Sequence, residues 1–253
     1  VIQLIEELKV DSVYYNQEKI AYIHTDDKVK VPLNPRPALR EQFTVTIYYG
    51  GNSVGSGVST GYNEQYQKHV TWSLSEAFHA MEWFPCKQVL SDKADSARII
   101  LTTGNDFMGV SNGILEKIDN KGDHKLTYHW ATHYPITYYL LSFTVADYQE
   151  YTFFVRLDSS AYDSVLVQNF VYDHPDYVSQ WEKDISRTGD LLKLYSRRFG
   201  TYPFIKEKYG HSLMERGGGM EHQTITSITN FNFLLVAHEL THQWFGNYVT
   251  CGS

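Results

Sequence analysis

The sequence contains few cysteines and prolines and no long apolar run. Its two cysteines, Cys86 and Cys251, lie far apart. A disulfide is possible but not implied, metal ligation by these thiols has weak support, and two unpaired structural thiols are the simpler interpretation. No apolar run reaches the roughly eighteen residues of a membrane-spanning helix, so the sequence predicts no membrane span.

The chain also lacks an excess of basic residues. Its formal net charge is -7, which argues against nucleic acid or an anionic membrane as a partner. Localisation stays open, because acidic chains with two cysteines occur both in the cytoplasm and among exported proteins.

Neither end of the sequence resembles a natural terminus. The chain starts at Val1 without an initiator methionine or a signal peptide, and it ends at Ser253 without a polar tail. We therefore expect it to be a piece of a longer protein.

Aromatic and apolar residues are abundant. The chain has 20 Tyr, 13 Phe and 5 Trp, and 42% of its residues are hydrophobic, so it can bury a sizeable core. Alternation at 43–49 and 126–130 and short apolar runs at 97–101 and 138–145 predict strands. The first part of the chain is expected to be a mostly antiparallel β-domain.

The pattern changes after about residue 163. Apolar residues from Val178 to Phe199 recur at helical spacing, a short strand is expected at 223–228, and a second helix at 232–246. The prediction is an α+β chain with an N-terminal β-domain at 1–163 and the first part of a second domain at 164–253.

The strongest motif lies in the second predicted helix. His238-Glu239-Leu240-Thr241-His242 is an HExxH sequence, which places His238 and His242 one turn apart on one helix face. Neutral imidazoles at that spacing can share one Zn²⁺ ion. Glu239 is offset from them, so it can act as a general base toward a metal-activated water.

A catalytic zinc of this kind needs a third protein ligand. One class of zinc proteases places a third His where this chain has Tyr248, which excludes that class. Another class uses a Glu on the next helix, roughly twenty residues further on. Gln243 to Ser253 contains no acidic residue, so this ligand is expected beyond Ser253. Cys251 is a weak substitute.

A glycine-rich segment precedes the zinc motif. Gly217, Gly218 and Gly219 allow a ligand to approach the backbone closely, and Met220 and Glu221 follow. A carboxylate beside exposed backbone groups is a suitable receptor for a peptide α-ammonium group. On its own, the segment is equally compatible with a turn and a solvated Glu221.

Together, the glycine-rich segment and the zinc motif resemble the M1 family of zinc aminopeptidases, the gluzincins that include leukotriene A4 hydrolase. The Gly-x-Met-Glu-Asn box of that family matches 218–222, except that His222 stands in place of Asn. The resemblance extends to 75–86, where Glu76 falls on a Gln/Glu position that also binds the substrate amine. It also includes 134–143 and covers about residues 40 to 253.

The resemblance implies an N-terminal saddle-shaped β-domain, a thermolysin-like catalytic domain, a Zn²⁺ cofactor and hydrolysis of the first peptide bond of peptides. It implies that Glu76 and Glu221 hold the α-amino group and that Glu239 acts as base. The family's transition-state-stabilising Tyr would also lie downstream, so this chain alone is expected to be inactive and to bind zinc weakly. An epoxide hydrolase or bifunctional relative, and a non-catalytic peptide-binding member, are the alternatives.

Overall fold

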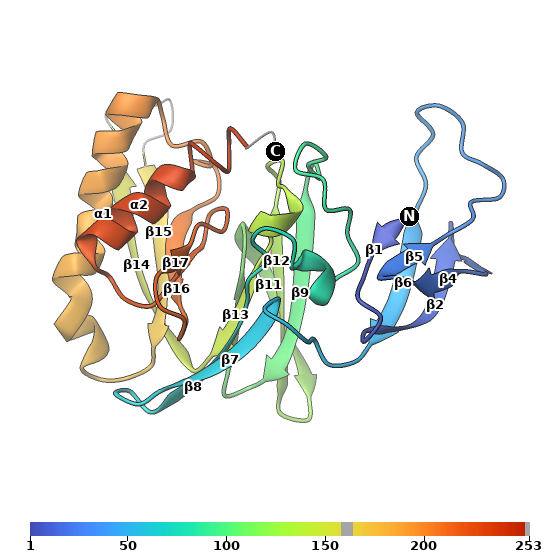
Figure 1. Cartoon of the computed structure of the whole chain (residues 1–253). Helices are drawn as coiled ribbons and strands as arrows, with labels where there is room; N and C mark the ends of the chain where they lie inside the picture. Colours follow the sequence, from blue (N-terminus) through green and yellow to red (C-terminus); the bar gives the residue numbers. More distant parts are fainter. Residues whose placement is uncertain (158–163, 251–253) are drawn as a thin grey trace.

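A computed structural model describes residues 1–157 and 164–250. The N-terminal lobe contains two antiparallel three-stranded sheets, with strand orders β1-β5-β4 and β3-β2-β6. They pack on a small separate core that includes Leu4, Leu8 and Val29. The strands are β1 (Ile2–Gln3), β2 (Lys9–Tyr15), β3 (Glu18–Ile20), β4 (Ile23–Thr25), β5 (Lys28–Lys30) and β6 (Val45–Gly50) (Figure 1).

The middle of the chain forms two further antiparallel sheets, with orders β10-β13-β8-β7 and β11-β12-β9. The short apolar run at 97–101 correctly predicts a strand, and residues along β9 alternate between half-buried and exposed, as in a strand with one covered face. These elements are β7 (Val58–Asn63), β8 (Lys68–Ser73), the 3-10 helix η1 (Ala80–Glu82), β9 (Ala97–Gly104), β10 (Met108–Ser111), β11 (Ile114–Gly122), β12 (Lys125–Thr132), the 3-10 helix η2 (Tyr138–Leu140) and β13 (Phe143–Ala146).

The remaining sheet is mixed and has the order β14-β15-β16-β18-β17. β15 and β18 both run parallel to β16, whereas the outer strands β14 and β17 are antiparallel to their neighbours. Both helices contact this sheet and each other. The elements are β14 (Tyr148–Arg156), β15 (Ser164–Tyr172), α1 (Tyr177–Phe199), β16 (Tyr209–Leu213), β17 (Gly219–Met220), β18 (Thr226–Ile228) and α2 (Phe233–His242).

The apolar periodicity correctly predicts α1. Ile185 and Leu192 are fully buried on the face that packs against the sheet. Gly189 lies on this face, where an added Cβ would come within 3.2 Å of Val155 Cγ2 on β14. A glycine in the middle of the helix therefore allows α1 to lie close to β14.

Three predicted elements differ from the structure. The strand expected at 138–145 begins as η2, and only Phe143–Ala146 is extended. The strand expected at 223–228 is confined to Thr226–Ile228, because Thr224 adopts a positive φ of 68°. The second helix ends at His242 rather than near 246, where Gly246 has a φ of +129°.

The predicted domain boundary near residue 163, like Cys251, falls outside the described residues. β14 precedes this position and pairs with β15 across nine residue pairs, from Tyr148 to Arg156.

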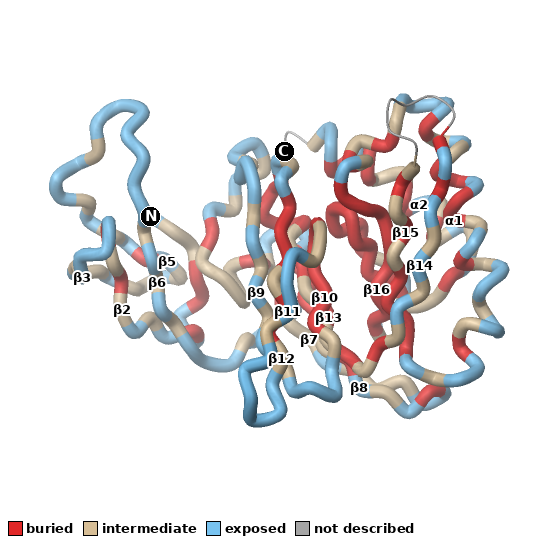
Figure 2. The backbone as a smooth tube through the Cα atoms, turned by 180° about the vertical axis from the view of Figure 1, so that it is seen from behind, coloured by how far each residue is buried: buried red, intermediate tan, exposed pale blue. Residues whose placement is uncertain are grey.

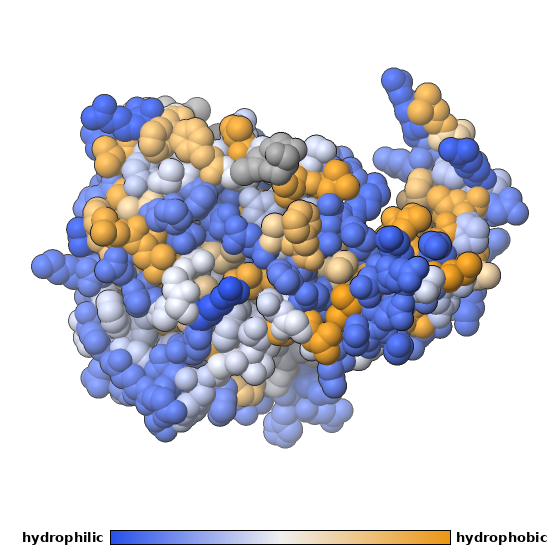
Figure 3. Space-filling view, in the orientation of Figure 1, coloured by the Kyte–Doolittle hydropathy of each residue, from blue (hydrophilic) through white to orange (hydrophobic). Residues whose placement is uncertain are grey.

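No helix in the described part of the chain is both long and apolar enough to span a membrane. Figure 3 shows apolar and polar residues interspersed on the visible face.

The middle sheets and the mixed sheet share one continuous hydrophobic core. Figure 2 shows buried backbone concentrated in β16 and in the facing strands β10 and β13. Lys208, fully buried, bridges these layers from the residue before β16. Its Nζ donates to the carbonyl of Ser111 at 3.1 Å and to that of Gly113, and it lies 4.6 Å from the centroid of the Trp130 ring.

Replacing Lys208 tests this bridge. Lys208→Met should lower the free energy of unfolding by about 2–4 kcal/mol, because the Ser111 and Gly113 carbonyls both lose a buried donor. Urea denaturation measures the change. The control is Lys117→Met on exposed β11, which removes an ion pair to Asp119 and should cost less than about 1 kcal/mol. Equal losses in both variants would contradict the bridge.

Candidate functional site

The two motif histidines lie on α2, whose first turn is capped by Asn232. The Asn232 side-chain oxygen accepts hydrogen bonds from the backbone N–H groups of Leu234 and Leu235, at 3.0 and 3.4 Å. His238 and His242 lie one helical turn apart; His238 is exposed and His242 is half-buried. Their Nε2 atoms lie 3.2 Å apart.

The geometry of the histidines fits a shared zinc ion. Two nitrogens that each lie ~2.0–2.1 Å from one tetrahedral ion are about 3.3–3.4 Å apart, close to the separation of the two Nε2 atoms. Nδ1 of His242 lies 3.1 Å from the Phe245 carbonyl, to which it can donate. That bond assigns the proton to Nδ1 and leaves the Nε2 lone pair free for a metal.

Glu239 extends from α2 toward β17. Its residue is only 4% exposed, and an added Cβ on Gly219 would lie 2.6 Å from its Oε1. Any side chain at Gly219 would therefore displace this carboxylate. Burial, reinforced by the negative charges of Glu221 and Glu76, raises the pKa of Glu239 to about 7.

The glycine-rich segment forms the outer strand of the mixed sheet. Gly219 and Met220 pair with β18, and the Met220 side chain is buried in the core. Gly218, with a φ of +91°, and Gly217 are exposed before the strand. The segment therefore combines an anchored end at Met220 with an accessible backbone at Gly217 and Gly218.

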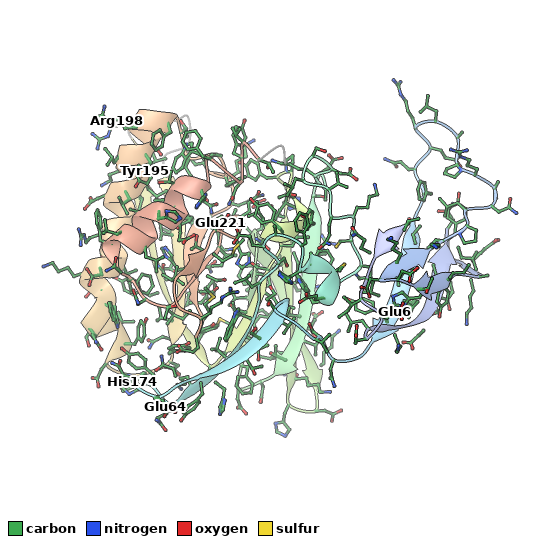
Figure 4. The ribbon with its side chains drawn as sticks, viewed as in Figure 1. Glu6, Glu64, His174, Tyr195, Arg198 and Glu221 are labelled. Atoms are coloured by element: carbon green, nitrogen blue, oxygen red, sulfur yellow. The ribbon has the colours of Figure 1, made fainter. Side chains whose placement is uncertain are left out.

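Glu221 directly follows β17, and Figure 4 places it beside α2. It is 9% exposed, and burial raises its pKa, while the nearby His242 and His238 oppose the shift and Glu76 adds to it. Ligand atoms of Glu221, Glu239 and His242 all lie within 4.8 Å of one another. The structure thus brings the glycine-rich segment and the zinc motif into one site.

Glu76 approaches the site from the other part of the chain. It lies between β8 and η1, and its side chain is exposed. Its negative charge contributes to the raised pKa values of both Glu221 and Glu239. Glu76 therefore adds negative charge to the region of Glu221, Glu239 and the two histidines, which favours a cationic ligand there.

Two different sets of groups in this site have the spacing of metal ligands. One set is the histidine pair, and the other is Glu221, Glu239 and His242. The Nε2 separation of the histidine pair matches that of two ligands on one tetrahedral ion. The group spacing of up to 4.8 Å in the second set exceeds the separation of neighbouring tetrahedral ligands.

Sequence reasoning missed two amides that hold the site together. Gln243 Nε2 donates to the carbonyls of Glu221 and His222, at 3.3 and 3.2 Å, and Asn247 Nδ2 donates to the Glu221 carbonyl at 2.7 Å. Gln243 Oε1 accepts from the backbone N–H of Thr224 at 3.0 Å. A signal was present in the sequence, since two amides spaced four residues apart follow directly on an apolar helix.

His222 stands where the family's box has Asn, and its surroundings do not suit a ligand role. It is fully buried, its Nδ1 lies 3.0 Å from Ser227 Oγ on β18, and burial lowers its pKa to about 3. His222 is therefore neutral and belongs to the packing of the segment that carries Glu221.

Several known proteins are similar in sequence to this chain. Human endoplasmic reticulum aminopeptidase 1 is 27% identical over 241 residues, which are 86% of this chain and 25% of that protein. Leucine aminopeptidase 2 of Vanderwaltozyma polyspora is 25% identical over 267 residues, 96% of this chain and 37% of that protein. The matched part of the chain therefore spans 25% and 37% of the length of these two relatives.

The fold is shared with a solved M1 zinc metallopeptidase from Deinococcus radiodurans. That structure matches with a TM-score of 0.83 at 24% identity, over 100% of this chain and 57% of the other. The family model of the peptidase M1 N-terminal domain matches residues 2–140, more than half of the chain. This chain belongs to the M1 peptidase family.

Proposed function

We propose that this chain supplies the amine-binding carboxylates, two zinc ligands and the general base of a zinc-dependent aminopeptidase. The reaction is hydrolysis of the first peptide bond of a peptide with a free α-amino group. The observation that carries the proposal is the convergence of Glu221 and Glu239 on His242, within 4.8 Å. The human and yeast relatives are both named aminopeptidases, which supports the same reaction.

Glu221 and Glu76 would bind the substrate. The α-ammonium group of a peptide is a cation with three donors, and two carboxylates can hold it by charge-assisted hydrogen bonds. The exposed backbone at Gly217 and Gly218 would face the peptide that follows the amine. Because the carboxylates recognise a chain end, cleavage would occur at the first bond and not within a chain.

His238 and His242 would hold the zinc ion, which when bound polarises the scissile carbonyl and acidifies water. Glu239 would take a proton on its carboxylate from the attacking water and return it to the leaving nitrogen. Its raised pKa of about 7 suits both transfers near neutral pH.

Solved M1 zinc metallopeptidases that share this fold include a mutant bound to L-arginine and a Deinococcus radiodurans mutant bound to a Tyr-Ser-Ala substrate. Both ligands carry a free α-amino group, which supports the proposal that this chain acts on peptides with a free amine. We propose further that a Glu outside this sequence completes the zinc site, since no acidic residue follows His242.

The function is tested with an aminoacyl-arylamide series and added zinc. Full-length protein should release the N-terminal residue, whereas the 253-residue chain alone should show little or no turnover, for lack of the third ligand. Glu239→Gln in the full-length protein should lower kcat by at least about a hundredfold. Peptide binding without turnover by the full-length protein would instead indicate a non-catalytic member, and robust turnover by the chain alone would refute the incomplete site.

The contact between Gly219 and Glu239 gives a second test in the full-length protein. Gly219→Ala should lower kcat/KM by about tenfold or more, because the new Cβ displaces the base from its position. Gly50→Ala at the end of β6 is the control: an added Cβ there meets nothing within 4 Å, and activity should change by less than about threefold. Similar losses in both variants would contradict a specific contact between Gly219 and Glu239.

The raised pKa of Glu239 predicts a pH-dependent stability of the metal-free chain. Between its ordinary pKa of 4.5 and about 7, the folded state keeps a proton that the unfolded state has lost, so stability falls as the pH rises. Glu239→Gln removes this penalty. It should raise the free energy of unfolding by about 1–3 kcal/mol at pH 8 and leave it unchanged near pH 4.

Urea denaturation across pH 4 to 8 measures this difference, with Glu64→Gln on the exposed turn between β7 and β8 as the control. A pH-independent effect of Glu239→Gln would contradict the assigned pKa.

A further inference from the structure

Glu76 is the one proposed amine ligand that regular secondary structure does not position. It lies in the segment that joins β8 to η1, and its side chain is exposed. Glu221, by contrast, directly follows a strand and is buried. An exposed carboxylate on an irregular segment can face the site reproducibly only if the backbone on both sides is held.

The upstream side of Glu76 is held from within the same segment. Ser75 is buried, its hydroxyl oxygen accepts a hydrogen bond from Trp83 Nε1 at 2.8 Å, and its carbonyl accepts from the His79 backbone N–H at 3.1 Å. These bonds fix the backbone up to Ser75. They do not fix the peptide that follows Glu76.

The downstream side is held by a tyrosine from a distant part of the chain. The Tyr138 hydroxyl donates to the carbonyl of Ala77 at 2.7 Å. Tyr138 is only 6% exposed and begins η2. Its ring forms one wall of a cleft of about 290 Å³, which Phe84, Ile136 and Leu141 also line.

The next residue reaches the other half of the site. The Tyr139 hydroxyl donates to the carbonyl of Gly246, at 3.3 Å, in the turn that follows α2. The Leu140 carbonyl accepts from Asn112 Nδ2 at 2.9 Å, which ties η2 to the turn after β10. One short turn of helix therefore contacts both the segment of Glu76 and the segment that follows His242.

We propose that Tyr138 is a positioning residue for recognition of the substrate's α-amino group, and that it acts by holding the Ala77 carbonyl so that Glu76 faces Glu221. The inference rests on the proposed function. Tyr138 does not touch the substrate. Its hydroxyl sets the distance between one amine-binding carboxylate and the zinc helix, through the adjoining Tyr139.

Tyr138→Phe isolates this effect. The ring remains in the cleft wall, and Ala77 is exposed, so water can replace the lost donor and the fold should persist. In the zinc-loaded full-length protein, KM for aminoacyl-arylamides should rise about tenfold with kcat nearly unchanged, because amine binding weakens while the base stays in place. The matched control is Tyr128→Phe, which removes a similar bond to the Phe107 carbonyl, 3.2 Å long, away from the site.

A double-mutant cycle shows whether Tyr138 acts through Glu76. Glu76→Ala should raise KM more than Tyr138→Phe, and the double variant should match Glu76→Ala alone, because the Tyr138 hydroxyl then has no amine-binding side chain left to position. A structural role for Tyr138 would instead multiply the two effects. An unchanged KM in Tyr138→Phe, or multiplied effects, overturns the inference.

A binding measurement separates this inference from the proposed function. Leucinamide and N-acetyl-leucinamide are titrated by calorimetry into Glu239→Gln protein with and without Tyr138→Phe, so that turnover is blocked in both. Protein with Tyr138 intact should prefer the free amine, and the preference should shrink about tenfold with Tyr138→Phe. Equal preferences overturn the inference even if the protein hydrolyses no peptide, whereas absence of turnover alone bears only on the proposed function.

Discussion

The site depends on two buried side-chain amides that join the end of α2 to the strand end that carries Glu221. Gln243 and Asn247 donate to the same Glu221 carbonyl, and Gln243 also bonds His222 and Thr224. Both amides are fully buried, so an unmade bond would cost the desolvation of a polar group. The two amides therefore fix the backbone of Glu221 relative to the end of α2, where His242 lies.

The part of the chain that precedes β14 is structurally part of this site. Its turn after β10 contributes Asn112 Nδ2 to the Gln223 carbonyl at 2.7 Å and the Gly113 N–H to Thr224 Oγ1 at 2.8 Å. Lys93 adds a bond to the Asn247 carbonyl at 2.9 Å. Residues that precede β14 thus hold both the backbone after Glu221 and the turn after α2.

The sequence predicts the parts of this arrangement that depend on local periodicity. The α+β class, helix α1 and the helical placement of His238 and His242 all follow from spacing and are confirmed. The end of α2 and the 3-10 turn at Tyr138 were not predicted, because both involve contacts with segments far away in the sequence. Gln243 and Asn247 were missed for the same reason, since their partners lie on another element.

Glu76 illustrates the intermediate case. The family resemblance assigns it to the amine site, while nothing in its local sequence predicts that it lies near Glu221. The structure supports this proximity, because the negative charge of Glu76 adds to the raised pKa of both Glu221 and Glu239. Its role in amine binding stays a prediction, as does the division of the chain near residue 163.

The central claim is that the two helix histidines hold the metal while the carboxylates remain free for amine and proton. Anomalous diffraction at the zinc edge, on crystals of the full-length protein, tests it most directly. We expect one ion about 2.0–2.1 Å from Nε2 of both His238 and His242. Glu221 and Glu239 should lie outside its ligand set. An ion held instead by Glu221, Glu239 and His242, with His238 unbound, would contradict this claim.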